Sequence, residues 1–161
     1  MHVPSDDGTG WRDWITPKLQ TEFNLIVEDP AKKTVNGGLC EVKDDKKKFK
    51  EMAKREDWEQ LKEGFYPIVR KDLRCVDKAD FIIAVYDPTI ASFGTIHEII
   101  EAAHQKKPIL VRYDREQLDH FNPWLTCLVK PQWLFPTWEK MFEYLSEIDS
   151  GVIETSHWGL E

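Results

Sequence analysis

The sequence lacks the features that would place a protein outside the cytoplasm or in a membrane. Its three cysteines, Cys40, Cys75 and Cys127, lie far apart and form no CxxC pair. Scattered thiols of this kind indicate a reduced, intracellular protein rather than a disulfide framework. The longest strongly apolar stretch, residues 81–85, is far shorter than the roughly 20 residues of a membrane-spanning helix. Because the first residues are also polar and unlike a signal peptide, we expect a cytoplasmic protein with no membrane contact.

Positive charge is scarce as well. There are 22 Lys and Arg residues against 29 Asp and Glu residues, giving a formal net charge of −7. A protein that binds a nucleic acid polymer needs a basic face, so we expect none as a partner. A small anionic substrate is still compatible with this charge, because one local cradle can hold a phosphate group. No GxGxxG or GxxxxGK[ST] loop is present, which disfavours dinucleotide and nucleoside triphosphate chemistry.

A zinc-protease motif is incomplete. The stretch from His97 to Glu101 begins like HExxH but lacks the second histidine. His97, Glu101 and His104 share one helical stripe, so a metal-binding face is a minor alternative to a solvated or subunit-contact edge. We expect no metal or organic cofactor.

Apolar and aromatic residues are well supplied. Hydrophobic residues make up 41% of the chain, which has seven Trp and eight Phe. This composition predicts one globular domain over residues 1–161, with the tail at 150–161 unassigned. Apolar periodicity predicts helices over 10–22, 43–63, 67–78, from about 94 onward and 137–148, and strands over 25–27, 81–86 and 108–111. Pro17 is expected to kink the first helix or to split it with Thr16 as a second cap, and Pro67 to lie in the first turn of its helix.

The alternation of strands with helices predicts an open, mostly parallel α/β sheet with helices on both faces. Ligands of such sheets bind at the carboxyl ends of the strands. The sequence therefore directs attention to the loops after Val27, Tyr86 and Val111.

The richest of these loops runs from Ser92 to Glu98, between a buried strand and the clearest helix. Free N–H groups at a helix start favour an anion. Gly94 would let the backbone approach a ligand, and Ser92 or Thr95 can donate a hydroxyl. Glu98, in about the first turn and off the apolar stripe, is a candidate carboxylate nucleophile. The ordinary alternative is a capped helix with an acidic first turn.

Asp72 is a candidate second carboxylate. By itself it is typical of a solvated helix residue. It becomes a functional candidate only if its helix brings it to the strand end where Glu98 lies.

Several stretches together resemble the nucleoside 2-deoxyribosyltransferase family, which includes the deoxynucleoside 5′-monophosphate N-glycosidases. The matching segments are Lys71-Asp72-Leu73, Val76 to Tyr86, Ser92 to Glu98, and Ala102. They follow the family pattern of a helix with Asp-Leu, an Ala-Asp before a core strand, and a small-residue loop whose glycine precedes a glutamate by four residues. The similarity is strong over residues 66–112 and weak elsewhere.

The resemblance implies a flavodoxin-like fold, a homo-oligomer and a small nucleoside or nucleotide substrate. Glu98 would match the nucleophile that attacks the anomeric carbon, and Asp72 the carboxylate that holds the sugar. Ser92 resembles the serine that contacts the 5′-phosphate in the monophosphate hydrolases, where the base-exchanging transferases often have an acid. Trp11 and Arg12 are candidates for stacking on a base and binding phosphate, although Trp11 also suits a core position.

The chain departs from the family at its start. The family begins with a short core strand, whereas Met1 already falls in the loop that follows it. We expect that the recorded start is late or that this strand is missing, which would leave a neighbouring strand edge unpaired. A non-catalytic nucleotide-binding or regulatory module is therefore the main alternative to an enzyme. A glycohydrolase of a nicotinamide nucleotide is another.

Overall fold

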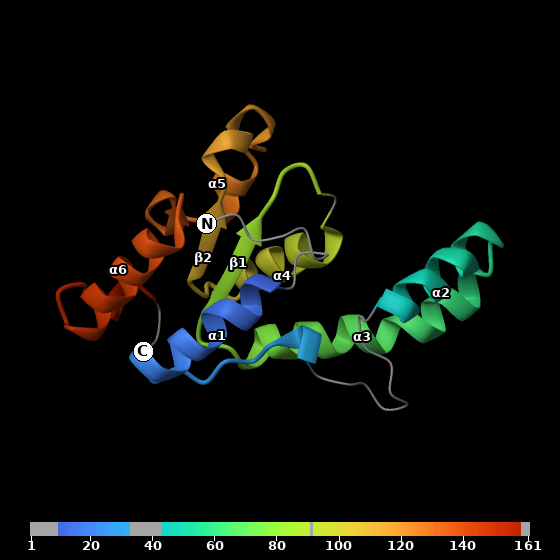
Figure 1. Cartoon of the computed structure of the whole chain (residues 1–161), viewed down its shortest axis with the longest axis horizontal. Helices are drawn as coiled ribbons and strands as arrows, with labels where there is room; N and C mark the ends of the chain where they lie inside the picture. The colour runs from blue at the N-terminus through green and yellow to red at the C-terminus, as the bar shows by residue number, and fades with distance from the viewer. Residues whose placement is uncertain (1–9, 33–42, 91, 159–161) are drawn as a thin grey trace. The chain divides into compact units, whose positions relative to one another are not determined.

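The computed structural model describes residues 10–32, 43–90 and 92–158 (Figure 1). Its contacts divide the chain into two compact units, the first ending at Cys75 and the second beginning at Val76. The prediction of a single domain is not tested by this division. Within the described ranges, no helix is both long and apolar enough to cross a membrane.

The first unit is helical in its described part. Its elements are α1 (Gly10–Glu22), the 3-10 helix η1 (Pro30–Lys32), α2 (Lys43–Lys54) and α3 (Trp58–Lys78), the last of which continues into the second unit. Helix α1 confirms the predicted bounds, and Pro17 lies inside it without splitting it. A proline removes a single N–H donor from the helix, and here the remaining turns stay continuous.

The segment Leu25-Ile26-Val27 is not a strand, so that prediction is wrong. The chain leaves α1 through Asn24, which has a φ of 52°, and the Leu25 N–H donates to the Leu19 carbonyl at 3.2 Å. Ile26 is 92% exposed. A short apolar run becomes a strand only when a neighbour pairs with it, and no strand among the described residues pairs with this one.

The predicted single helix over residues 43–63 is two helices. Glu56, with a φ of 59°, ends α2 in a left-handed turn. The Glu56 N–H donates to Ala53 at 3.1 Å and the Asp57 N–H donates to Met52 at 3.0 Å, which is the Schellman pattern of a helix end. A glutamate gives no sequence signal for this turn, because glycine is the residue that normally marks it.

Pro67 lies in the middle of α3 rather than at a helix start. The turns before it are stabilised by packing against α2. A Cβ placed on Gly64 would lie 3.1 Å from Phe49 Cε1, so any larger residue would require the Phe49 ring to move by a few tenths of an ångström. Phe49 is buried and meets the Phe65 ring edge-on at 5.2 Å. These contacts hold the helix together on the amino-terminal side of the proline.

The second unit contains a small open sheet of three parallel strands. They are β1 (Ile82–Tyr86), β2 (Ile109–Tyr113) and β3 (Leu134–Phe135), in that spatial order. Ala84 pairs with Val111, and Val111 pairs with Leu134. The two predicted strands of this region and the mixed α/β class are thus confirmed.

Helices surround the sheet. They are α4 (Phe93–His104), α5 (Leu125–Leu128) and α6 (Trp138–Asp149), with 3-10 helices η2 (Arg115–His120), η3 (Pro131–Trp133) and η4 (Thr155–Trp158). The predicted helices near residues 94 and 137–148 correspond to α4 and α6. Thr137 caps α6 by accepting the Lys140 N–H at 3.3 Å.

Both faces of β2 are covered. The consecutive residues Ile109, Leu110 and Val111 are all buried, and successive side chains of a strand point to opposite faces. Helix α4 contacts β1 and β2, and α6 contacts β2 and β3. The two helices lie on opposite sides of the strands (Figure 1). Phe135 and Tyr144 of α6 lie 5.4 Å apart, which places α6 on the Phe135 face.

The tail that the sequence leaves unassigned contributes to this core. Trp158 is buried, and its ring lies 5.3 Å from that of Phe81. The Tyr144 hydroxyl accepts hydrogen bonds from the indole N–H of Trp133 at 2.9 Å and of Trp158 at 3.1 Å. The described part of the tail therefore closes the α6 side of the sheet.

Helices α4 and α6 end in the same Schellman pattern as α2. Lys106, with a φ of 58°, occupies the left-handed position after α4, and Gly151, with a φ of 74°, occupies it after α6. The side chain of the next residue, Lys107, caps the carboxyl end of a different helix, α3. Its Nζ donates to the Val76 carbonyl at 2.6 Å and to the Asp77 carbonyl at 2.7 Å, which supplies a cation where the dipole of α3 is negative.

Candidate functional site

The chain leaves β1 through a tight turn at the carboxyl end of the sheet. The Asp87 carboxylate accepts the Thr89 N–H at 2.8 Å and the Thr89 hydroxyl at 2.6 Å. The Asp87 carbonyl accepts the Ile90 N–H at 3.2 Å. This Asx turn redirects the backbone toward the start of α4, so Asp87 has a structural role that accounts for its position.

Ser92 stands directly before α4 and supports the helix through its backbone. Its N–H donates to Ile90 at 2.9 Å, and its carbonyl accepts the Ile96 N–H at 3.0 Å. Its side chain makes no capping hydrogen bond. The N–H groups of Phe93, Gly94 and Thr95 have no carbonyl one turn earlier in the helix. The start of α4 therefore offers amide donors and a positive dipole end to an anion.

Gly94 is exposed, and no contact among the described residues explains why this position is glycine. A Cβ built on it would meet no atom within 4 Å, and its φ lies outside the left-handed region. Neither packing nor backbone conformation thus requires it. The open space beside its Cα agrees with the predicted close approach of a ligand to this backbone.

Glu98 lies one helical turn beyond Gly94 and is half-buried. Residues four apart share a face of a helix, and helical side chains lean toward the amino-terminal end. The Glu98 side chain thus projects over the face on which the space beside Gly94 lies. Its place in the second turn, rather than in the first, weakens the predicted contribution of the dipole, which falls off within one turn.

Three aromatic rings gather at the same end of the sheet. Tyr86 and Tyr113 are paired across β1 and β2, and Phe121 lies 5.6 Å from the first ring and 6.2 Å from the second. The Tyr86 hydroxyl accepts the Asn122 N–H at 3.3 Å. Apolar periodicity did not predict this cluster. Its only signal was that a tyrosine ends each of the two strands.

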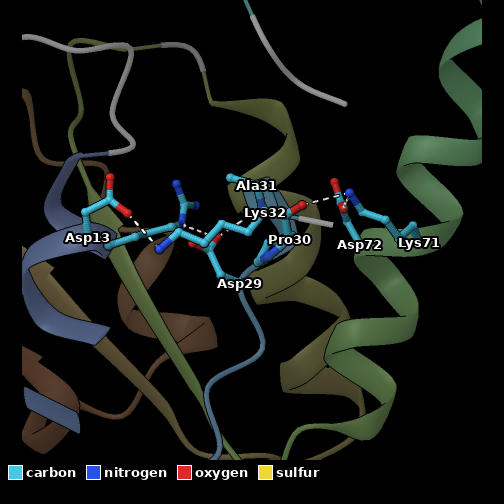
Figure 2. A network of polar contacts seen from close by, with 8 residues as sticks. Asp13, Asp29, Pro30, Ala31, Lys32, Lys71 and Asp72 are labelled. Atoms are coloured by element: carbon cyan, nitrogen blue, oxygen red, sulfur yellow. Dashed lines mark hydrogen bonds and ion pairs between the residues drawn. The ribbon is translucent and has the colours of Figure 1, made fainter. Parts of the chain in front are cut away.

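Asp72 lies on α3, in the first unit, within a polar network (Figure 2). Its Oδ1 is 3.5 Å from the Lys71 Nζ, and both side chains are less than one-fifth exposed. Lys71 also donates to the Pro30 carbonyl at 2.7 Å, which ties α3 to η1. Asp72 is therefore not the solvated residue of the ordinary alternative. Its predicted meeting with Glu98, which belongs to the second unit, stays a prediction.

The same network gives Arg12 a structural partner. Arg12 Nε lies 3.7 Å from Oδ1 of Asp29, which is only 8% exposed. The Arg12 guanidinium also stacks over the Trp11 ring at 4.7 Å, and Trp11 is half-buried. A phosphate would have to compete with Asp29 for this arginine, so the structure weakens the case for Arg12 as a phosphate ligand.

Lys32 and Asp13 complete the network. The Lys32 Nζ donates to Asp13 at 2.7 Å, and this hydrogen bond raises the pKa of Lys32 above its usual value. The Asp29 carboxylate accepts the Ala31 N–H at 3.0 Å. These bonds hold η1 against α1 (Figure 2), and they stabilise the chain after the segment 25–27, which is not a strand.

Helix α4 thus brings together four of the seven predicted site residues: Ser92, Gly94, Thr95 and Glu98. The other three, Asp72, Trp11 and Arg12, belong to the first unit. Of the alternative metal face, His97 and His104 are exposed, and Glu101 accepts a hydrogen bond from Gln105 at 3.0 Å. No group of three potential metal ligands occurs within the described residues.

Comparisons of the chain with protein-family models, with curated proteins and with solved structures found no match.

Proposed function

We propose that this protein cleaves or transfers the N-glycosidic bond of a 2′-deoxynucleoside 5′-monophosphate or of a deoxynucleoside. The observation that carries the proposal is the arrangement at the start of α4. An unexplained glycine beside open space, unpaired helix-start amides and the Glu98 carboxylate share one end of the helix. These features follow a parallel strand at its carboxyl end, where α/β sheets bind ligands. The three parallel strands are compatible with the flavodoxin-like fold that the resemblance implies.

In the proposed reaction, Glu98 attacks the anomeric carbon as the base departs. The C–N bond breaks with oxocarbenium-like character, which a nearby carboxylate stabilises. A covalent deoxyribosyl ester of Glu98 forms, and water or a second base then displaces the carboxylate with net retention. The absence of a 2′-hydroxyl suits this step, because that group would withdraw electrons from the forming cation. Asp72 is proposed to hold the sugar.

The remaining groups would orient the substrate. A 5′-phosphate would accept hydrogen bonds from the amides of Gly94 and Thr95 and from the Ser92 hydroxyl. The ring cluster of Tyr86, Tyr113 and Phe121 offers aromatic faces on which a base can stack. The half-buried position of Glu98 limits water access to the ester, which would favour transfer when an acceptor base is present.

The test is incubation with a panel of deoxynucleosides and their monophosphates, with and without an acceptor base. Free base without acceptor identifies a hydrolase, and a new nucleoside identifies a transferase. Glu98→Gln should reduce turnover at least about a thousandfold, as expected for loss of a nucleophile. The matched control is Glu101→Gln, which removes a carboxylate from the same helix outside the site and should leave turnover within a few-fold of wild type. Equal activity of the two variants would refute the role of Glu98.

A non-catalytic nucleotide-binding module is the second candidate, and the sheet supplies an observation in its favour. Among the described residues, β1 is an edge strand with no partner on its outer side. An unpaired edge of this kind would leave one side of the site open to solvent. Binding of monophosphates without turnover of any substrate would favour this candidate. A nicotinamide nucleotide added to the same panel tests the third alternative.

A further inference from the structure

Arg112 stands apart from the proposed α4 site. It lies on β2, next to the last residue of the strand, where it pairs with Val85 of β1 and Phe135 of β3. Side chains of paired residues in parallel strands point to the same face. Arg112 therefore lies on the Phe135 face, which α6 covers through Tyr144. Helix α4, with Gly94 and Glu98, is on the other side of the sheet (Figure 1).

Arg112 is half-buried, and one of its donors is not satisfied by the described residues. Its Nε is buried without a hydrogen-bond partner, and within the described part of the chain no ion pair involves this guanidinium. The group cannot lose its charge at any accessible pH. Its neighbours in register are apolar, and Glu143 of α6 is exposed and pairs with Lys140. A guanidinium with a buried donor is normally hydrogen-bonded, paired or bound to an anion.

Because acidic residues outnumber basic ones in this chain, the lack of an ion-pair partner for Arg112 among the described residues is unexpected. With 29 carboxylate residues against 22 cationic ones, a partner for a structural arginine would be easy to supply. The nearest carboxylate along the strand, Asp114, instead accepts the Glu116 N–H at 3.0 Å and caps η2. The position of Arg112 at the carboxyl end of the central strand is the place where α/β sheets receive ligands.

We propose that Arg112 is the cation of a binding site for a small oxyanion, a phosphate or carboxylate group, at the carboxyl end of β2. The planar guanidinium offers paired N–H donors that match two oxygens of such a group. The apolar surroundings formed by Val85 and Phe135 strengthen the interaction by excluding water. The proposal does not depend on the chemistry of Glu98, because the two residues lie on opposite sides of the sheet.

The test compares the thermal stability of the folded protein in chloride and in inorganic phosphate at equal ionic strength. For the wild-type protein, phosphate at about 100 times its Kd should raise the Tm by about 5 °C or more. The main variant is Arg112→Met, which keeps the length and removes the charge. The matched control is Arg115→Met, which removes an exposed arginine three residues later and should keep the full response to phosphate.

The Arg112→Met variant should lose the part of the Tm rise in phosphate that comes from this site, so that its response is clearly smaller than that of wild type and of Arg115→Met, and any remainder is that of the start of α4. In chloride its Tm should be equal to or above that of wild type, because a half-buried charge whose Nε has no hydrogen-bond partner among the described residues has been removed. An undiminished response to phosphate in Arg112→Met would overturn the proposal. So would a wild-type protein that does not respond to any probe while Arg112→Met is strongly destabilised, since Arg112 would then be paired within the protein.

Two further measurements complete the design. Thymidine 5′-monophosphate, thymidine and acetate, used as additional probes, distinguish the phosphate of a nucleotide from a free anion. A response to the nucleotide alone shows that the site binds the phosphate of a nucleotide. A response to phosphate or acetate shows that it binds a free anion. If Arg112→Met does not fold, an NMR measurement on the wild-type protein replaces it. The Nε–H resonance of Arg112 is assigned by its disappearance in the Arg112→Lys variant. This resonance should move on addition of a responding anion, and an unmoved resonance refutes the site.

Discussion

Gly94→Ala separates the requirements of the fold from those of the proposed ligand. The added methyl group would meet no atom within 4 Å, and the backbone at this position is accessible to any L residue. Alanine stabilises a helix relative to glycine by about 0.5–1 kcal/mol, because it restricts the unfolded chain. For a chain of this size that gain corresponds to a Tm higher by about 1–4 °C. The variant should therefore be more stable than wild type.

Function should change in the opposite direction. If a phosphate oxygen contacts the helix-start amides, the methyl group of the alanine occupies part of its place. Loss of one hydrogen bond to a charged group costs about 1.5–3 kcal/mol, which corresponds to about 10- to 150-fold in kcat/KM for the monophosphate. Deoxynucleosides, which lack the phosphate, should be affected much less. Thermal unfolding and steady-state kinetics on both substrate classes measure the two effects.

Gly151→Ala is the matched control. A Cβ at Gly151 would also meet no atom within 4 Å, but its φ is 74°. A left-handed conformation costs a non-glycine residue about 1–2 kcal/mol, so this variant should be less stable while its kinetics stay unchanged. A lower Tm for Gly94→Ala would refute the account of the backbone at the start of α4. A higher Tm with unchanged kcat/KM for monophosphates would refute the phosphate cradle.

Three other changes test the structure. Lys107→Met should lower the free energy of unfolding by about 1–3 kcal/mol, because two carbonyls at the end of α3 lose a cationic donor; the exposed Lys62→Met should be neutral, and equal effects of the two in chemical denaturation would contradict the cap. Lys106→Gly should raise the Tm by about 2–4 °C, since glycine removes left-handed strain at the end of α4, and calorimetry showing a lower Tm would refute that conformation. Arg12→Gln should destabilise the protein by about 1–3 kcal/mol, because it leaves the buried Asp29 carboxylate without its cation. A variant with normal stability and weakened phosphate binding would instead restore Arg12 to the ligand site.

The sequence was sufficient for the elements with a long and regular apolar pattern. Helix α4 and strands β1 and β2 were predicted to within a few residues, because alternation and helical periodicity depend on which residues are apolar. The stop of α2 at Glu56 and the continuity of α3 through Pro67 were not predictable in this way. Both depend on contacts between α2 and α3, such as that of Phe49 with Gly64, which override local preference. The strand predicted over 25–27 was wrong because a strand needs a neighbouring strand to pair with, and the local sequence does not show whether one is present.

The same division holds for the candidate site. The order of Ser92, Gly94 and Glu98 along the chain indicated by itself that small residues would mark a helix start, with a carboxylate one turn after the glycine. In the structure only Ser92 precedes α4, and Gly94 and Thr95 already lie in its first turn. Only the tertiary structure decided that Gly94 faces open space, that Arg12 is engaged by Asp29, and that the Nε of the half-buried Arg112 has no hydrogen-bond partner among the described residues. Periodicity records which residues share a face of one element, whereas the partners of a charged side chain come from segments distant in the sequence, and their approach is fixed by packing.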